Sequence, residues 1–233
     1  MSFAAALLDA LAPPLCALCR APAGPFPWLC TECARTLRLL HGARCLRCGA
    51  PSPLQAPLCA ACPPWPDALV AARSAAVHAG AARELVHALK YGGRLGAARP
   101  LGALAAAAAR DLPLAAATVV LAVPLHAAAR RRRGFNQAAE IAAVVARALG
   151  LPFRPRLLAR VRDAAPSALR TAAGRRRSVR GAFRARAAVR GGAFLLVDDV
   201  LTTGATVGAC ARALHRRGAA RIFVATATRA RVP

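Results

Sequence analysis

Phe194-Leu-Leu-Val-Asp-Asp-Val-Leu-Thr-Thr-Gly-Ala-Thr206 is the stretch that decides the fold. The apolar run from Ala193 to Val197 predicts a buried strand, and residues 205–217 have the composition of a helix. At the carboxyl end of a parallel strand, two adjacent acids can face out of the sheet, while the turn behind them offers N–H groups and hydroxyls at a helix N-terminus. This arrangement suits a phosphosugar, with the acids on a ribose diol and the turn on a phosphate; the residues are Asp198 and Asp199, then Thr202, Thr203, Gly204 and Thr206.

An apolar strand that ends in Asp-Asp is also typical of a Walker B strand, of a receiver-type aspartate site, or of a simple metal or capping position. A Walker B strand needs a P-loop partner of the form G-x-x-x-x-G-K-[ST]. The chain has a single lysine, Lys90, and its context Ala-Leu-Lys-Tyr-Gly-Gly does not fit that motif. The threonines that follow the acid pair therefore favour the phosphosugar interpretation.

The stretch resembles the PRPP loop of the type I phosphoribosyltransferases. In that family the acid pair holds the ribose hydroxyls of PRPP, and the Thr-Thr-Gly-x-Thr turn holds its 5′-phosphate. The resemblance implies that PRPP, arriving with Mg²⁺, is bound by Asp198, Asp199, Thr202, Thr203, Gly204, Ala205 and Thr206.

Eight of the nine cysteines form four C-x-x-C pairs in two copies of the layout C-x2-C-x10-C-x2-C. Such pairs bind tetrahedral Zn²⁺, and sites made only of cysteine are structural. We expect two zinc ions. Sequential pairing within each half is preferred, and an interleaved cross-brace remains an alternative; the ligands are Cys16, Cys19, Cys30, Cys33, Cys45, Cys48, Cys59 and Cys62. The ninth, Cys210, is interpreted as a small buried apolar residue.

The chain has 233 residues and a formal net charge of +25, with arginine clusters at 130–133 and 175–177. The positive electrostatic field that results favours partners that carry phosphate. The alternative is an ordinary basic surface that is solvated by water. The charge alone does not distinguish PRPP from DNA. The longest apolar stretch, residues 112–129, is interrupted by two prolines and a histidine. We therefore expect no membrane insertion, and the absence of a signal-peptide pattern predicts a cytoplasmic protein.

The stiff segment Pro63-Pro-Trp-Pro66 predicts a boundary between an N-terminal ribbon region, residues 1–66, and a larger domain, residues 67–233. In the larger domain, strand and helix patterns alternate. This order predicts an α/β fold with a parallel sheet and helices on both faces. The expected strands are 68–78 (a strand or a hairpin), 118–123, 153–158, 193–197 and 221–228, and the expected helices are 81–89, 95–110, 134–149 and 205–217.

Several further motifs, in the same order along the chain, resemble the ComF (ComFC/GntX) family. They are the double cysteine ribbon, Leu89-Lys-Tyr-Gly-Gly93, Val123-Pro-Leu-His126, Arg133-Gly-Phe-Asn-Gln137, Val179-Arg-Gly-Ala-Phe183 and the PRPP loop. The chain departs from the family at Ser167, where a Gln is usual, and at Ser178, where an Asn is common.

By analogy with phosphoribosyltransferases, the turn after strand 118–123 grips the diphosphate of PRPP. The turn formed by Pro124, Leu125 and His126 would supply backbone N–H groups, and Arg130 or Arg133 would supply charge. Lys90 and Tyr91 would reach the diphosphate or the acceptor. Asn136 is a further candidate, since it is the only asparagine. Alternatives stay open: His126 as an ordinary loop histidine, and Asn136 as a helix-starting residue.

Membership of ComF implies an accessory factor in DNA uptake during natural transformation, with single-stranded DNA and competence proteins as partners. The low aromatic content, 4%, argues against an extended stacking platform, so phosphate contacts would dominate. The alternative is an active phosphoribosyltransferase acting on an unidentified nitrogen acceptor, and a third possibility is PRPP sensing without turnover. Glutamine-dependent amidotransfer is not expected, because the chain begins Met1-Ser2 without a catalytic cysteine.

Overall fold

The computed structural model describes residues 14–24, 26, 28–52, 57–162 and 179–230. Its centre is a parallel four-stranded sheet with the strand order β1-β6-β5-β2. The strands are β1 (Leu69–Val77), β2 (Val119–Ala122), β5 (Ala193–Leu201) and β6 (Arg221–Arg229). The strands are buried apolar runs, as expected for a sheet covered on both faces. Phe194, Leu195 and Leu196 of β5 and Phe223 of β6 are fully buried and form the middle of the core.

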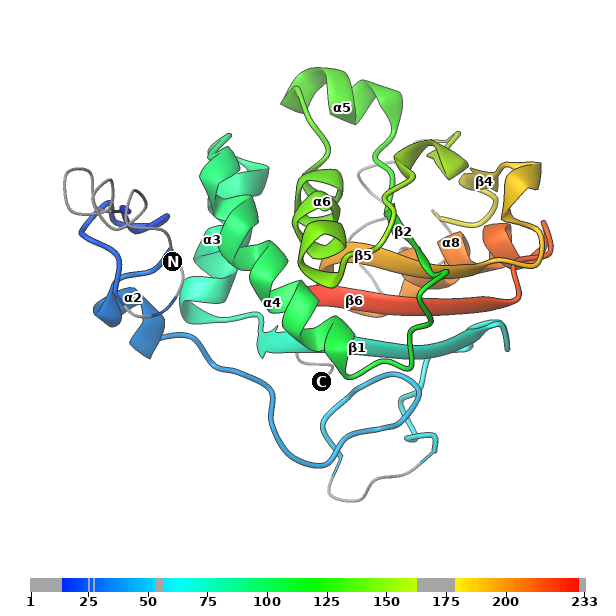
Figure 1. Ribbon diagram of the computed structural model, residues 1–233, viewed down its shortest axis with the longest axis horizontal. Helices are drawn as coiled ribbons and strands as arrows, with labels where there is room; N and C mark the ends of the chain where they lie inside the picture. The colour runs from blue at the N-terminus through cyan, green and yellow to red at the C-terminus, as the bar shows by residue number, and fades with distance from the viewer. Residues whose placement is uncertain (1–13, 25, 27, 53–56, 163–178, 231–233) are drawn as a thin grey trace.

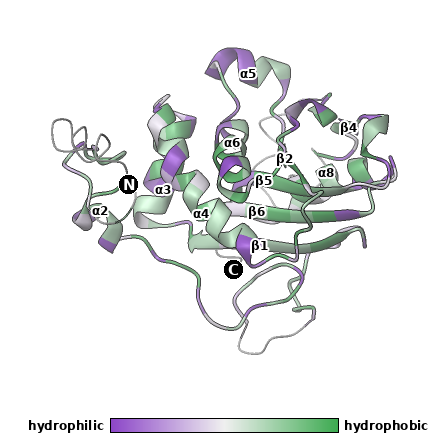
Figure 2. Ribbon diagram, in the orientation of Figure 1, coloured by the Kyte–Doolittle hydropathy of each residue, from purple (hydrophilic) through white to green (hydrophobic). Residues whose placement is uncertain are grey.

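Helices cover both faces of this sheet, as the alternation of patterns predicts. Three of them, α3 (Gly80–Lys90), α4 (Ala98–Arg110) and α6 (Gln137–Leu149), lie on the face toward the viewer in Figure 1, whereas α8 (Ala205–His215) lies behind it. A shorter helix, α5 (Ala127–Arg133), stands above the sheet and was not expected from the sequence. Figure 2 shows the sheet as predominantly hydrophobic and α5 as partly hydrophilic. Within the described residues, no helix is long and apolar enough to span a bilayer.

The predicted helix 95–110 is confirmed, with a 3-10 turn, η1 (Leu95–Ala97), before α4. Pro100 lies in the first turn of α4, where an N–H group has no partner within the helix, so its proline costs little. The predicted helix 134–149 begins later, at Gln137. Asn136 is its N-cap, and Gly134 ends α5 in the left-handed conformation with φ of 85°.

The short strand predicted at 153–158 is wrong for most of its length. Phe153 forms an isolated parallel bridge with Val120, after which the 3-10 helix η2 (Pro155–Leu157) interrupts the extended backbone. Pro155 explains this, since it has no N–H for a ladder and its fixed φ suits the start of a helical turn. Two strands follow instead in a separate antiparallel ribbon, β3 (Leu158–Arg160) and β4 (Phe183–Ala185), with η4 (Ala187–Val189) after it.

The cysteine-rich region, which contains the short helix α2 (Thr31–Arg35), packs along the outer edge of β1. The amides of Val77 and Ala72 donate to the carbonyls of Arg38 (2.8 Å) and Arg47 (2.7 Å). From β6, Arg229 donates to the carbonyl of Cys48 at 2.7 Å. These bonds occupy an edge that would otherwise expose unpaired backbone groups. The segment between the two ribbons is therefore built into the sheet.

Candidate functional site

The strand, turn and helix predicted around the acid pair are present as β5, residues 202–204 and α8. The strand continues four residues beyond the predicted Val197 and includes both acids. Asp198 pairs in register with Thr226 of β6, next to the point where β2 ends opposite Val197. The acids therefore lie at the carboxyl end of the sheet, where ligands bind in open α/β folds.

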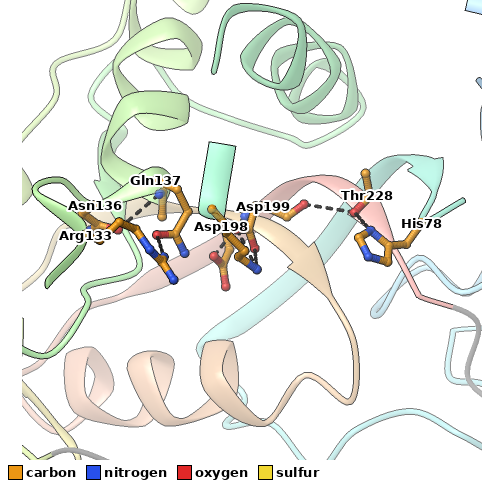
Figure 3. Close-up of polar contacts among 9 residues, drawn as sticks. His78, Arg133, Asn136, Gln137, Asp198, Asp199 and Thr228 are labelled. Atoms are coloured by element: carbon orange, nitrogen blue, oxygen red, sulfur yellow. Dashed lines mark hydrogen bonds and ion pairs between the residues drawn. The ribbon is translucent and has the colours of Figure 1, made fainter. Parts of the chain in front are cut away.

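The two acids differ in their surroundings, which the sequence did not indicate. Asp199 is only 3% exposed, and its carboxylate receives the ammonium of Lys90, with Nζ 3.0 Å from Oδ1 and 2.8 Å from Oδ2. The contact to Oδ2 is an ion pair without hydrogen-bond geometry. On the main-chain side, the Thr228 hydroxyl donates to the carbonyl of Asp199 at 3.2 Å and lies 3.0 Å from Nδ1 of His78 (Figure 3). Asp199 is thus held on both sides.

Lys90 is the last residue of α3, and its side chain reaches the carboxylate of Asp199 from there. Burial by itself would lower the pKa of Lys90, but attraction by Asp199 and Asp198 outweighs it and the pKa is raised. Lys90 is therefore a charged partner of the acid pair. Its neighbour Tyr91 is 75% exposed and packs its ring edge-on against His87.

Asp198 is partly buried, and its carboxylate accepts the N–H of Asp199 at 2.9 Å. Burial, followed by repulsion from Asp199, raises the pKa of Asp198 to about 8, against a smaller lowering by Lys90. One ammonium therefore serves two acids, and repulsion between the acids favours the protonated form of Asp198. An additional cation or hydroxyl donor beside Asp198 would relieve this imbalance.

The turn after β5 places hydroxyls at the start of α8. Thr202 is exposed, Thr203 and Thr206 are partly buried, and Thr203 Oγ1 accepts the N–H of Ala205 at 3.4 Å. Gly204 adopts φ of 69°, a left-handed conformation that disfavours any residue with a Cβ. The turn therefore places threonine hydroxyls beside the N-terminus of α8, where N–H groups can attract an anion.

Trp65 supports this turn, a role that the sequence interpretation missed. It belongs to the proline-rich boundary segment, but it is 6% exposed and its indole Nε1 donates to the carbonyl of Gly204 at 2.9 Å. A Cβ on Gly204 would lie 2.6 Å from the Trp65 ring, and one on Gly208 would also lie 2.6 Å from it. The available signal was that a large aromatic residue, one of only two tryptophans, stands among prolines.

The residues predicted beyond β2 surround a different hollow, of about 650 Å³. Its lining in the described part of the chain includes Pro124, Leu125, Arg130 and Asn136 but none of the β5–α8 turn residues. This hollow therefore contains part of the group predicted after β2 and none of the turn group.

Three polar residues near this hollow have structural partners. His126 is the N-cap of α5 and accepts the N–H of Ala128 at 3.4 Å. Asn136 accepts the N–H of Ala138 at 3.2 Å and donates to the carbonyl of Val123 at 3.1 Å, so that it fixes the chain after β2 to the start of α6. Arg133 donates to the side-chain oxygen of Gln137 (Figure 3). The helix-starting alternative for Asn136 is what the structure shows.

The cysteines form two tetrahedral groups in sequence order. Cys16, Cys19, Cys30 and Cys33 form the first, Cys45, Cys48, Cys59 and Cys62 the second, and the sulfur atoms within each lie within 4.8 Å of one another. Sequential pairing is therefore the arrangement found, and the interleaved cross-brace is not. The remaining cysteine, Cys210, is fully buried on α8, as expected.

The protonation of these thiols fits a metal. For Cys16, burial acts to raise the pKa, but N–H groups from Cys19 and Cys30 outweigh it and lower the pKa to about 6. For Cys62, burial and repulsion from Cys48 and Cys45 raise the pKa to about 12. Four thiolates so close together need a cation to balance them, and Zn²⁺ is the ion that tetrahedral cysteine sites prefer.

We expect elemental analysis to find about two zinc ions per chain, one for each four-cysteine group. Removing the second site should be the more damaging change, because Cys45 and Cys48 are fully buried and Cys48 is bonded to Arg229 of the sheet. Cys48→Ser should therefore lower the melting temperature of the full chain more than Cys19→Ser, whose cysteine is exposed. Equal small losses in thermal melting would contradict this order.

Comparison with known protein families agrees with this description. The family described as double zinc ribbon domain matches residues 7–63, and the one described as phosphoribosyl transferase domain matches residues 115–232. The ribbon match covers both cysteine groups, and the second match covers β2, β5, the turn and α8. The fold and the sites thus define a phosphoribosyltransferase-type domain that carries a double zinc ribbon.

Two curated relatives identify the family more closely. The chain is 35% identical to DNA utilization protein YhgH of Salmonella typhimurium and 33% identical to the Escherichia coli K12 protein of the same name. Each alignment covers 221 residues, 91% of this chain and 95% of the relative. The chain therefore belongs to the ComF (ComFC/GntX) family, together with YhgH.

Solved structures with a similar arrangement include the allosteric regulatory enzyme of purine biosynthesis, with 24% identity, a TM-score of 0.38 and coverage of 55% of this chain and 25% of that one. A second is the HGPRT-ase from Leishmania tarentolae in complex with GMP, with 16% identity, a TM-score of 0.33 and coverage of 62% and 65%.

Proposed function

We propose that this protein binds PRPP at the turn between β5 and α8 and acts in DNA uptake as a factor associated with single-stranded DNA. The observation that carries the proposal is the turn itself, where Gly204 in a left-handed conformation and the threonine hydroxyls follow a half-buried acid at the carboxyl end of the sheet. A phosphate fits the turn, and the ribose hydroxyls fit Asp198. The YhgH relatives, named for DNA utilization, support the second part.

Mg²⁺ would accompany PRPP at the same end of the sheet. Asp198 supplies an oxygen ligand of the kind that Mg²⁺ prefers, and the local excess of one carboxylate over the single ammonium of Lys90 favours a cation there. Bound Mg²⁺ would neutralise the diphosphate. Asp198 would then be held in its charged form, and Lys90 would keep Asp199 oriented.

PRPP with Mg²⁺ should stabilise the full chain against heat. At a PRPP concentration about 100 times the Kd, binding adds about 2.7 kcal/mol, which corresponds to roughly 5–10 °C in a chain of this size. Asp198→Asn should abolish this increase, because the amide carries no charge and donates where a carboxylate accepts. Differential scanning calorimetry with and without PRPP measures both. An unchanged increase in the variant would exclude this site.

The stability of Asp198→Asn at different pH values provides a control for its folding. In the protein without PRPP, the pKa of Asp198 is about 8 in the folded state, above its ordinary value of 3.8. The protonated side chain of Asp198 therefore stabilises the fold fully below about pH 3.8, and this stabilisation is lost as the pH rises through 8. Asp198→Asn should therefore be at least as stable as the wild type at pH 8, and the stability of the wild type should fall more steeply between pH 5 and 8. A folded and stable variant that ignores PRPP separates loss of binding from loss of structure.

The second candidate function is transfer of the phosphoribosyl group to a nitrogen acceptor, which the match to the phosphoribosyl transferase domain favours. Transfer would break the bond between the anomeric carbon and diphosphate and form a bond from that carbon to nitrogen, while the displaced diphosphate leaves. Positioning and charge stabilisation dominate such a reaction. Release of diphosphate from PRPP in the presence of nucleobases would support transfer, and PRPP binding without release would support sensing alone.

A further inference from the structure

The antiparallel ribbon β3–β4 has a basic hollow on each side. The larger, of about 650 Å³, is lined by four arginines, Arg130, Arg156, Arg160 and Arg186, and by one acid, Glu140. The smaller, of about 280 Å³, is lined by four more, Arg162, Arg184, Arg216 and Arg217, and by no acid among the residues that the structure describes. Together these eight arginines are called the arginine track below.

Among the described residues, no acid forms an ion pair with the arginine track. The interactions seen within the track leave its charge in place: Arg160 lies 5.6 Å over the Phe183 ring and donates to the carbonyl of Arg162 at 3.1 Å. Eight guanidinium groups with one acid beside them in the described part of the chain favour external anions, and guanidinium groups bind phosphate in a bidentate manner.

The position of the track relates it to the site of the proposed function. Arg130 follows β2, at the same end of the sheet as the acid pair, and the β3–β4 ribbon carries the basic surface away from there to the end of α8 at Arg216 and Arg217. A ligand that covers this length must be long and must carry repeated negative charges. A polynucleotide strand has both properties.

The larger hollow also contains two aromatic rings, Phe135 and Phe153, both partly buried. Aromatic rings in a basic groove stack on bases that are not paired in a duplex. A volume of about 650 Å³ is large enough to take unstacked bases. These features favour one strand over two.

We propose that the arginine track is the binding surface for single-stranded DNA, with phosphates along both hollows and bases against Phe135 and Phe153. The proposal rests on the DNA-associated role proposed above and adds the surface that performs it. The surface does not include the PRPP turn, whose residues line neither hollow, but its larger hollow shares Pro124, Leu125, Arg130 and Asn136 with the residues expected on the diphosphate side.

The test measures the affinity of the zinc-loaded full chain for a labelled oligothymidylate by fluorescence anisotropy at several salt concentrations. Two double variants neutralise exposed arginines, Arg156→Gln with Arg186→Gln in the larger hollow and Arg184→Gln with Arg217→Gln in the smaller. Each should weaken binding roughly tenfold and reduce the slope of log Kd against log salt by about 1.4, that is about 0.7 for each lost phosphate contact.

A matched control removes the same amount of charge elsewhere. Arg99 and Arg110 are exposed on α4 and line neither hollow. Arg99→Gln with Arg110→Gln should change the Kd less than twofold to threefold. An equal loss in this control would show that only the overall field matters and would overturn the proposal, as would unchanged binding in both track variants.

Two further readouts separate this proposal from the others. The track variants should keep the PRPP-dependent increase in melting temperature, and Asp198→Asn should keep its affinity for the oligonucleotide. If the wild type does not bind PRPP but the arginine variants still weaken DNA binding, the PRPP site is overturned and the proposal for the arginine track stands. Unlabelled duplex DNA that competes as well as the single strand, at equal phosphate concentration, would overturn the assignment to one strand.

Discussion

Replacement of Lys90 by Met is expected to lower the free energy of unfolding by about 3 kcal/mol, because it leaves the carboxylate of Asp199 buried without its counter-ion. The side chain of Asp199 is 4% exposed and that of Lys90 22%, so water does not replace the ammonium at the carboxylate. Thermal melting of the zinc-loaded protein would show a fall of roughly 6–12 °C.

The matching double variant tests the cause. Lys90→Met with Asp199→Asn removes both charges and should recover most of the lost stability, since the cost of Lys90→Met comes from the uncompensated acid. Lys90→Arg keeps the charge but not the shape of the ammonium, and is expected to fall between the two. If the double variant is no more stable than Lys90→Met, the ion pair is not the reason that the sole lysine stands at this position.

Gly204→Ala should be the most damaging change in the turn. A residue with a Cβ at a φ of 69° strains the backbone, which costs about 1–2 kcal/mol. The added Cβ would also lie 2.6 Å from the Trp65 ring, and this crowding costs about 1–3 kcal/mol more. The melting temperature should fall by roughly 4–20 °C, and PRPP should no longer stabilise the protein, because the displaced turn misplaces its hydroxyls. Calorimetry with and without PRPP measures both effects.

Gly208 supplies the control, since its Cβ would also lie 2.6 Å from Trp65 but its backbone is ordinary helix. Gly208→Ala therefore tests the crowding alone. In a Trp65→Ala background, Gly208→Ala should cost almost nothing, whereas Gly204→Ala should still cost the part due to backbone strain. If Trp65→Ala removes the cost of Gly204→Ala as completely as that of Gly208→Ala, the left-handed conformation of Gly204 is not required.

Local patterns were sufficient for most of the sheet and for the metal sites. The four core strands and the helices around them follow from apolar runs separated by polar turns, and the two copies of C-x2-C-x10-C-x2-C led to the two cysteine groups that the structure contains. The exceptions are instructive. Residues 153–158 are apolar enough for a strand, but Pro155 turns the chain into a helical turn. The arginine cluster at 175–177 lies outside the described residues, and so do Ser167 and Ser178, where the chain departs from the family pattern.

The site was predicted less completely than the fold. The acid pair, the threonine turn and the glycine were located correctly at the end of β5, because they are consecutive in the sequence. The pairing of Lys90 with Asp199 joins residues 109 positions apart, and the bond from Trp65 to Gly204 joins residues 139 apart. No periodicity connects such residues, and only the packing of α3 and of the proline-rich segment against the sheet brings them together.

The amino-acid sequence by itself determined the class of fold, the two four-cysteine groups and the position of the acid pair and the threonine turn at the end of β5, because each follows from local patterns along the chain. Only the tertiary structure decided which acid is buried and paired with Lys90, which tryptophan holds the turn, and how scattered arginines form one basic surface. The physical reason is that burial and the balance of charge are properties of the space around a side chain, and residues distant in sequence fill that space.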